Sequence, residues 1–295
     1  MKKFAKNVLA AAVALAGFGA AVPMPASAGL LSIRITDPNA GIVFLCADNN
    51  PACDTNAVIN EVNMDTAVVN AALSVASVYN FIGLAATSNF AGGDPLAAII
   101  TTTGAVLSQA TVANARPLII EVSQTDWTKP TGRLRNLFQG PTTIFTNGAV
   151  GDSLSFWGLN DPANLIWAGN PAFDPPNTNS LDLPAGAADD FVTPLVKFNA
   201  GVVDANCGIV AGNTQTCSGN SQIVGILEDN PYSMSQRVIM DAGLSPVAGA
   251  LTRIEFSHAI SKFTAPAQVP EPGTMLLFGA ALAGLAVSRR KAVAK

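Results

Sequence analysis

The fold is decided by the stretch Leu31-Ser32-Ile33-Arg34-Ile35-Thr36-Asp37-Pro38-Asn39-Ala40-Gly41-Ile42-Val43-Phe44-Leu45. Apolar and polar side chains alternate from Leu31 to Ile35, which is the period of a strand with one buried face. Asp37-Pro38-Asn39 supplies turn residues, and Gly41 to Leu45 is a short apolar run. The stretch therefore predicts a strand, a turn and a second strand.

The same pattern continues along the chain. Further short apolar runs lie at Leu118 to Val122, Ser153 to Leu159, Ile223 to Leu227 and Leu251 to Phe256. Clusters of Gly, Pro, Asn and Asp separate them, so the sequence predicts an all-β, antiparallel β-sandwich of the jelly-roll or immunoglobulin-like type. Asn56 to Leu73 is the exception, because Val58, Val62, Val69 and Leu73 have spacings compatible with a helix.

Charge narrows the range of partners. Residues 29–268 carry nine Lys and Arg against 19 Asp and Glu, a net charge of −10, whereas the whole chain has −4. An acidic body lacks the basic surface that binds phosphates, so no nucleic acid partner is expected. Val, Ile, Leu and Phe are too frequent for a disordered chain.

The N-terminus has the three parts of a secretory signal. Lys2, Lys3 and Lys6 form a positive region, Val8 to Val22 is apolar, and Ala26-Ser27-Ala28 fits a cleavage site for small residues. Residues 1–28 are therefore predicted to be a signal peptide that is removed after Ala28.

The C-terminus also has three parts. Val269-Pro270-Glu271-Pro272-Gly273-Thr274 precedes an apolar run from Met275 to Val287, and Arg289-Arg290-Lys291 form a basic stop. A helix over this run reaches only about 20 Å of the roughly 30 Å hydrocarbon core, unless flanking residues and snorkelling arginines extend it. Residues 269–295 are predicted to be a sorting signal with a transmembrane helix over 275–287.

This tail resembles the PEP-CTERM sorting signal of Gram-negative bacteria. The resemblance implies recognition by an exosortase-type transpeptidase, transient membrane anchoring, and then a place at the cell surface or outside the cell. Residues 29–268 resemble the β-rich ectodomains that often precede such a tail. Part of this resemblance lies in the pattern from Tyr232 to Ile239. That resemblance carries over no catalytic residue.

The four cysteines form two local pairs, Cys46 with Cys53 and Cys207 with Cys217. An exported chain enters an oxidising compartment, so both pairs are predicted to be disulfides. The alternative of a zinc site is disfavoured, because the spacing exceeds C-x₂₋₄-C and His258 is the single histidine. A disulfide that closes the first loop is worth roughly 2 to 3 kcal/mol on the chain-entropy model.

Catalytic constellations are scarce. A Ser-His-Asp arrangement would have to use His258, which follows Glu255-Phe256-Ser257 at an apparent strand end. His258 is predicted to be a surface or partly buried structural histidine. Glycoside hydrolysis needs only two carboxylates, which leaves Asp189, Asp190, Glu228 and Asp229 as candidates. With Asn230 these residues could also bind calcium, although no D-x-[DN]-x-[DN]-G loop is present. No catalytic residue, metal site or cofactor is predicted.

Aromatic and basic side chains offer a second route to sugars. Trp127 follows a polar segment and is the best candidate for an exposed ring, whereas Trp157 is predicted to pack in the core. Arg133 and Arg135 would share one face of a strand, either to meet an acidic polysaccharide or to protect a sheet edge. The proline-rich stretch 170–190 is predicted to be a long loop or a divide within one domain.

Two classes of function follow. The first is a non-enzymatic surface or matrix protein that associates with exopolysaccharide in a biofilm or acts in adhesion. The second is a secreted carbohydrate-binding module or carbohydrate-active enzyme that is sorted by the same tail. The scarcity of catalytic constellations favours the first.

Cleavage at both ends gives a direct test of the two signals. In cells that carry an exosortase, we expect a secreted form that starts at Gly29 and ends near Pro270-Glu271-Pro272, because both segments have the chemistry of processing sites. Intact-mass analysis of the extracellular fraction measures both ends. Recovery of the intact tail there would contradict the sorting prediction.

Overall fold

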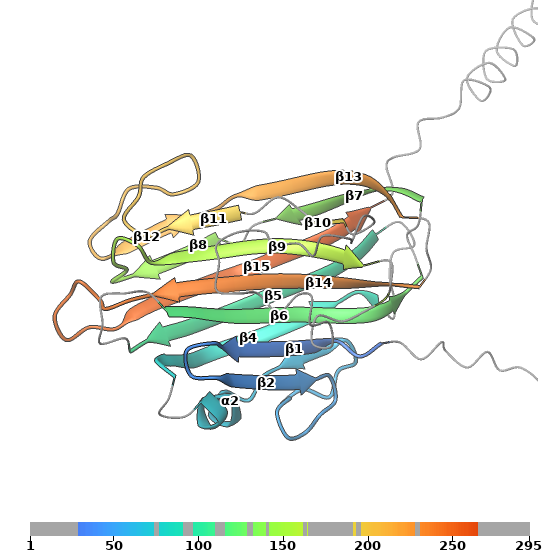
Figure 1. Cartoon of the computed structure of the whole chain (residues 1–295), viewed down its shortest axis with the longest axis horizontal. Helices are drawn as coiled ribbons and strands as arrows, with labels where there is room; N and C mark the ends of the chain where they lie inside the picture. Colours follow the sequence, from blue (N-terminus) through green and yellow to red (C-terminus); the bar gives the residue numbers. More distant parts are fainter. Residues whose placement is uncertain are drawn as a thin grey trace, which may run out of the picture.

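The computed structural model describes residues 29–73, 77–90, 97–109, 116–128, 132–139, 142–161, 164, 191–192, 196–227 and 231–264. These residues form two antiparallel sheets with one hydrophobic core between them (Figure 1). The prediction of an antiparallel sandwich is confirmed at this level.

The first sheet has seven strands and lies in front in Figure 1. Its strands are β1 (Ser32–Asp37), β2 (Ile42–Ala47), β6 (Arg116–Trp127), β9 (Ser153–Asp161), β10 (Phe191–Val192), β11 (Val196–Asn199) and β14 (Tyr232–Ala242). The order is β10-β9-β14-β6-β1-β2, and β11 also pairs with β9. Strands on either side of the stretch 170–190 therefore share this sheet.

The second sheet has eight strands. They are β3 (Glu61–Asn63), β4 (Tyr79–Ser88), β5 (Ala97–Ser108), β7 (Gly132–Gln139), β8 (Thr142–Thr146), β12 (Thr214–Cys217), β13 (Asn220–Leu227) and β15 (Thr252–Thr264). The order is β12-β8-β15-β5-β4-β3, and β7 lies between β13 and β15. β15 is thus flanked by β5 on one side and by β8 and then β7 on the other.

One helix packs against β4 and β2. α2 (Thr66–Leu73) begins after Asp65, whose Oδ1 accepts hydrogen bonds from the amides of Ala67 (2.9 Å) and Val68 (3.3 Å). The prediction of a helix over Asn56 to Leu73 is wrong in its first half. There the chain turns at Asn60, which has a φ of 65°, and then forms β3, because Val62 is buried in the core.

The core joins the sheets by aromatic and polar contacts. The ring of Phe156 on β9 lies 5.9 Å from Phe198 on β11 and 5.6 Å from Phe256 on β15. Gln236 on β14 crosses the core, where its Nε2 donates to the carbonyls of Ile100 (2.8 Å) and Ala259 (3.1 Å). Its Oε1 accepts from Thr102 Oγ1 at 2.6 Å, so a fully buried amide is satisfied on the opposite sheet.

Tyr79 makes a second polar link between the sheets. Its hydroxyl accepts a hydrogen bond from the amide of Ala242 at 3.0 Å and lies 3.4 Å from the carbonyl of Met240, to which it donates. Burial raises the pKa of the Tyr79 phenol well above its usual range. The hydroxyl therefore stays neutral and holds β4 to the end of β14.

Disulfides join Cys46 to Cys53 and Cys207 to Cys217, the two local pairs that the sequence predicts. Their Cα atoms lie 5.8 Å and 4.0 Å apart.

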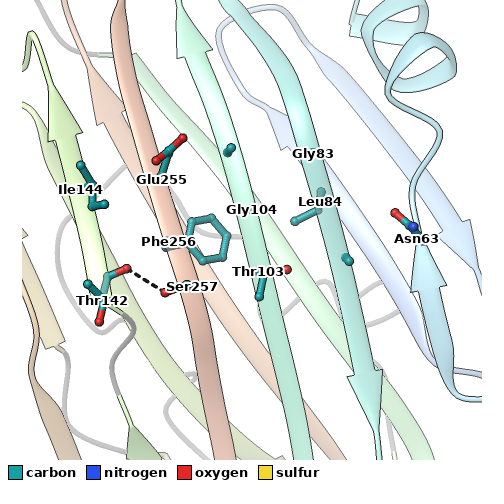
Figure 2. Close-up of a pocket in the computed structure, with 12 residues that line it drawn as sticks. Asn63, Gly83, Leu84, Thr103, Gly104, Thr142, Ile144, Glu255, Phe256 and Ser257 are labelled. Atoms are coloured by element: carbon teal, nitrogen blue, oxygen red, sulfur yellow. Dashed lines mark hydrogen bonds between the residues drawn. The ribbon is translucent and has the colours of Figure 1, made fainter.

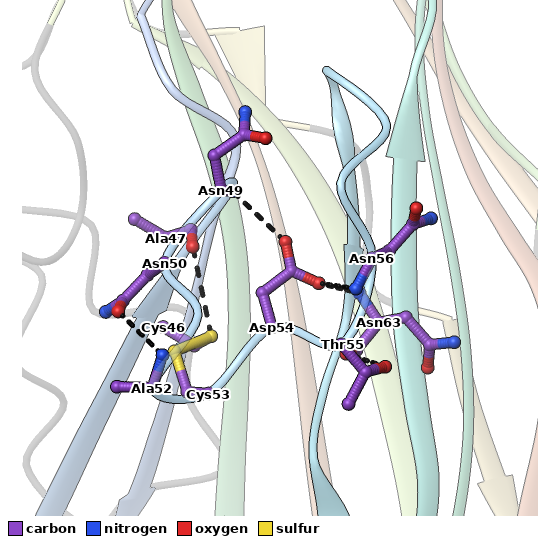
Figure 3. The surroundings of a disulfide bond; sticks show 10 residues. All are labelled: Cys46, Ala47, Asn49, Asn50, Ala52, Cys53, Asp54, Thr55, Asn56 and Asn63. Atoms are coloured by element: carbon purple, nitrogen blue, oxygen red, sulfur yellow. Dashed lines mark hydrogen bonds between the residues drawn. A yellow bond between two sulfur atoms is a disulfide. The ribbon is translucent and has the colours of Figure 1, made fainter.

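Figure 3 shows the first bond at the end of β2, beside the carboxylate of Asp54. Asp54 Oδ1 accepts from the amides of Asn56 (2.9 Å) and Asn63 (3.0 Å), and Oδ2 accepts from Asn49 (3.1 Å). The disulfide and the hydrogen bonds to Asp54 together order the segment that connects β2 of the first sheet to β3 of the second.

A buried ion cluster lies on the first sheet. Glu121 on β6 is 2% exposed and forms ion pairs with Arg34 on β1 and Arg237 on β14. These residues are cross-strand neighbours, so one row of the sheet places both guanidinium groups beside one carboxylate.

Several predicted features lie outside the described residues: the signal peptide 1–28 with Ala26 and Ala28, the stretch 170–190, and the tail 269–295 with its predicted membrane run. Among the helices that the structure describes, none has the length and hydropathy needed to span a bilayer.

Removing the carboxylate of the ion cluster should lower the stability of the fold. We expect Glu121→Ala to lower the free energy of unfolding by about 3 to 5 kcal/mol, because two guanidinium groups lose the buried carboxylate that they share. Urea unfolding of the full chain in mild detergent, followed by tryptophan fluorescence, measures the change.

Glu255→Ala is the matched control for this experiment. Glu255 pairs with Arg253, but their side chains are 30% and 45% exposed. Solvent screens such a pair, so the expected loss is about 0 to 1 kcal/mol. Equal losses in the two variants would contradict the assignment of Glu121 as a buried structural anion.

Candidate functional site

A shallow groove of about 390 Å³ lies on the outer face of the eight-stranded sheet. It runs across β8, β15, β5, β4 and β3, and Figure 2 shows the side chains that line it. Five strands at a spacing of about 4.8 Å extend over roughly 19 Å, so the groove suits an extended ligand. Its main outward-facing residues are Asn63, Gly83, Ala85, Thr103, Ala105, Thr142, Ile144, Glu255 and Ser257.

Strand alternation explains why these residues meet. Leu84 on β4 and Phe256 on β15 point into the core and are buried. Their chain neighbours therefore point to the opposite face of the sheet. Pairing then places Ala85 beside Thr103, and Ala105 beside both Gly83 and Glu255.

Two β-bulges flank the floor of the groove. The register of β4 against β5 shifts between Phe81 and Gly83, and the register of β15 against β5 shifts between Phe256 and Ala259. A bulge bends its strand and increases the local twist, so both irregularities shape the surface between them. Asn70 of α2 supports the first bulge, since its side chain exchanges hydrogen bonds of 2.7 Å and 2.9 Å with the backbone of Phe81.

The chemistry of the groove is mainly neutral and polar. Thr103, Thr142 and Ser257 contribute hydroxyls, Asn63 contributes an amide, and the glycine and alanines keep the floor low. Ser257 Oγ donates to the carbonyl of Thr142 at 3.4 Å across the β15–β8 pair. Glu255 is the one carboxylate among the described residues of the lining, and it forms an ion pair with Arg253 on the same strand.

Gly104 lets the floor close over the core. A Cβ atom at this position would lie 2.6 Å from Cζ of Phe256 and 2.7 Å from Cε1. The Phe256 ring occupies the place of the missing side chain and packs against Phe156 beneath it. Gly83 differs, because a Cβ there would meet no atom within 4 Å.

His258 lies near this groove rather than at a strand end. It belongs to the bulge within β15, has a φ of 58° and is exposed, so the prediction that it ends a strand is wrong. A bulge interrupts the apolar alternation, which makes the middle of β15 resemble a boundary in the sequence. The prediction of a surface position for His258 is confirmed, and its structural role stays a prediction.

The prediction of an exposed ring at Trp127 is also wrong. Trp127 is 3% exposed and packs edge-to-face against Phe90, with the ring centroids 4.9 Å apart. Polar neighbours in the sequence misled the prediction, because a buried strand end is covered by residues distant in the chain. Trp157 lies on β9, outside the groove lining.

Arg133 and Arg135 both lie on β7, as predicted, but β7 is an internal strand. It pairs with β13 along its whole length and with β15 at Asn136 and Arg135, among other positions. The prediction that the strand carrying these arginines lies at a sheet edge is therefore wrong. The lining of the groove includes neither Arg133 nor Arg135.

The predicted carboxylates Asp189, Asp190, Glu228 and Asp229, with Asn230, lie outside the described residues, as do Pro270, Glu271, Pro272, Arg289, Arg290 and Lys291. Within the described ranges, no group of three or more His, Cys, Asp or Glu side chains could hold a metal ion.

Sequence reasoning missed most of the groove. Gly83, Ala85, Thr103 and Ala105 carry no recognisable motif, and Thr142 stands in a short run that was not predicted as a strand. The available signal was the pair of glycines inside apolar segments, Gly83 and Gly104, since glycine within a strand marks a bulge or a close approach.

Comparisons with known proteins are informative at the tail. A family model described as the PEP-CTERM protein-sorting motif matches residues 268–291. The chain thus carries a PEP-CTERM sorting signal, which implies that the protein is exported. No curated protein matches the chain.

Two solved structures resemble the chain weakly. One is TmCBM61 in complex with beta-1,4-galactotriose, at 10% identity and a TM-score of 0.23, covering 62% of this chain and 88% of that one. The other is the enzymatically active domain of tailspike protein 4 from bacteriophage CBA120, at 12% identity and a TM-score of 0.22, covering 63% of this chain and 19% of that one.

The two glycines of the floor should respond differently to a methyl group. We expect Gly104→Ala to destabilise the protein by about 1 to 3 kcal/mol, because the Phe256 ring has to move within a packed core. Gly83→Ala should be neutral or stabilising by up to about 1 kcal/mol, since its Cβ enters open space and restricts the unfolded chain. Thermal unfolding of both variants tests this, and a tolerated Gly104→Ala would contradict the packing described here.

Proposed function

We propose that this protein is a non-enzymatic component of the cell surface or extracellular matrix, which an exosortase-type transpeptidase sorts and whose sandwich associates with exopolysaccharide. The PEP-CTERM motif at residues 268–291 carries the proposal, because it marks the chain for export. The membrane run predicted at 275–287 holds the chain transiently while the motif is processed.

The groove supports the polysaccharide part of the proposal. Hydroxyl and amide groups of Thr103, Thr142, Ser257 and Asn63 are neutral donors and acceptors of the kind that pair with sugar hydroxyls. Its volume falls within the range of about 300 to 1,000 Å³ that is usual for small-ligand sites. Its course across five strands matches a chain-like ligand better than a compact one.

The acidic body favours a neutral ligand over an anionic one. Residues 29–268 have a net charge of −10, and Glu255 adds a carboxylate to the groove itself. An acidic polysaccharide would approach a body of like net charge, which costs affinity and slows encounter. We therefore propose neutral stretches of exopolysaccharide as the ligand.

The absence of turnover is a proposal based on the groove chemistry. Glycoside hydrolysis uses two carboxyl groups about 5 to 10 Å apart, whereas Glu255 is the single carboxylate in the described lining and pairs with Arg253. Such a surface supplies many weak polar contacts. Display of many copies on a matrix multiplies weak contacts through effective concentration.

Filling the groove tests the binding proposal. We expect the double variant Ala85→Leu, Ala105→Leu to lower retention on neutral exopolysaccharide in affinity electrophoresis by about tenfold, because two larger side chains occupy the floor. The full chain in mild detergent is used throughout. Ile59→Leu, an exposed position outside the lining, is the control and should bind as the parent does.

Two outcomes would overturn the proposal. Equal retention of the double variant and its parent would remove the groove from the ligand site. Release of sugar that stops when Asp189, Asp190, Glu228 or Asp229 is substituted would identify a carbohydrate-active enzyme instead. Deletion of the protein from its cells should weaken aggregation or matrix cohesion if the proposal holds.

A further inference from the structure

β2 is the edge strand of the seven-stranded sheet. It pairs on one side with β1, in an unbroken register from Ser32 opposite Ala47 to Asp37 opposite Ile42. Its sequence, Ile-Val-Phe-Leu-Cys-Ala, contains no charged residue and no proline. Natural edge strands commonly carry a lysine, a proline or a bulge that blocks further pairing, and β2 has none of these.

The backbone of β2 has unpaired groups on its free side. The amide of Asp48 donates to the carbonyl of Leu31 at 2.8 Å, which sets the alternation of the antiparallel ladder. The backbone N–H and C=O groups of Cys46, Phe44 and Ile42 therefore point toward β1. Those of Val43 and Leu45 point away from β1, to the free side of β2. Within the described part of the chain, the N–H and C=O groups of Val43 and Leu45 have no hydrogen-bond partner.

Side chains on this strand separate by face. Ile42 and Phe44 pack against the core, and α2 contacts β2. Val43 and Leu45 point to the outer face and are 65% and 53% exposed. The free edge thus combines four unpaired backbone groups with two exposed apolar side chains.

We propose that this edge pairs with β2 of a second copy of the chain, antiparallel and about a two-fold axis at Phe44. In this register Val43 of each copy lies opposite Leu45 of the other, and the two residues exchange both backbone hydrogen bonds. Four hydrogen bonds form, and each valine packs beside the leucine of the other copy.

Charge and symmetry both select a second copy. An antiparallel strand pair with identical strands is self-complementary, so one surface serves both partners. The body has a net charge of −10, yet β2 is uncharged, so two copies can approach here without like charges in contact.

The interface is small. One strand pair with four apolar side chains falls below the roughly 1,200 Å² of stable complexes, so the association is weak in dilute solution. On a surface that displays many copies, effective concentration raises its occupancy. The pairing thus adds contact between copies of the protein to the contact with polysaccharide, and it does not depend on the groove.

A charge at the edge should prevent the pairing. Sedimentation equilibrium of the full chain in a density-matched detergent measures the dimer dissociation constant. We expect Val43→Lys to raise this constant by about tenfold or more, because it places a charge and its hydration at the centre of the strand pair. Ile59→Lys is the matched control, since Ile59 is 66% exposed but lies in a turn, and it should leave the constant unchanged.

Hydrogen exchange locates the contact. The amides of Val43 and Leu45 should exchange about tenfold more slowly at high protein concentration than at low concentration, and this protection should be absent in Val43→Lys. An unchanged constant in Val43→Lys would overturn the proposal, as would a chain that stays monomeric. Protection of the same amides only when a peptide from another protein is added would assign the edge to that partner instead.

Discussion

The side chain of Gln236 is the contact on which the arrangement of the two sheets depends. Its amide is fully buried, so an unsatisfied hydrogen-bonding group there would cost a desolvation penalty. It is satisfied only when β14 lies opposite both Ile100 on β5 and Ala259 on β15. Apolar packing would tolerate small slips between the sheets, whereas this amide selects one relative position.

The relative position of the two sheets affects the shape of the groove, because β15 takes part in both. Ala259 ends the bulge that begins after Phe256, and the groove residues Glu255 and Ser257 flank Phe256 in the chain. The Phe256 ring fills the space beside Gly104 and contacts Phe156 of the other sheet. The outer surface of the eight-stranded sheet is therefore shaped by contacts made on its inner side, and a ligand groove needs no loop to form it.

Charge is distributed so that the sandwich has different surfaces for different contacts. On the first sheet, Arg34, Glu121 and Arg237 form one paired row, and Arg34 lies opposite Leu45 of the uncharged edge strand β2. The groove on the second sheet has neutral polar groups and one paired carboxylate. If both proposals hold, association between copies would not compete with binding of a polymer, because the two surfaces are separate.

The sequence by itself determined what depends on neighbouring residues. The alternation from Leu31 to Ile35, the turn at Asp37-Pro38-Asn39 and the two short cysteine loops are local features, and the structure contains β1, β2 and both bonds. The sorting motif at residues 268–291 is likewise a contiguous signal. Tertiary structure alone decided the rest. Trp127 is buried because Phe90 covers it, β7 is internal because β13 and β15 pair with it, and His258 lies in a bulge within β15. The groove unites residues of five strands that share no motif, because burial and strand pairing join segments distant in the chain and no local pattern records their partners.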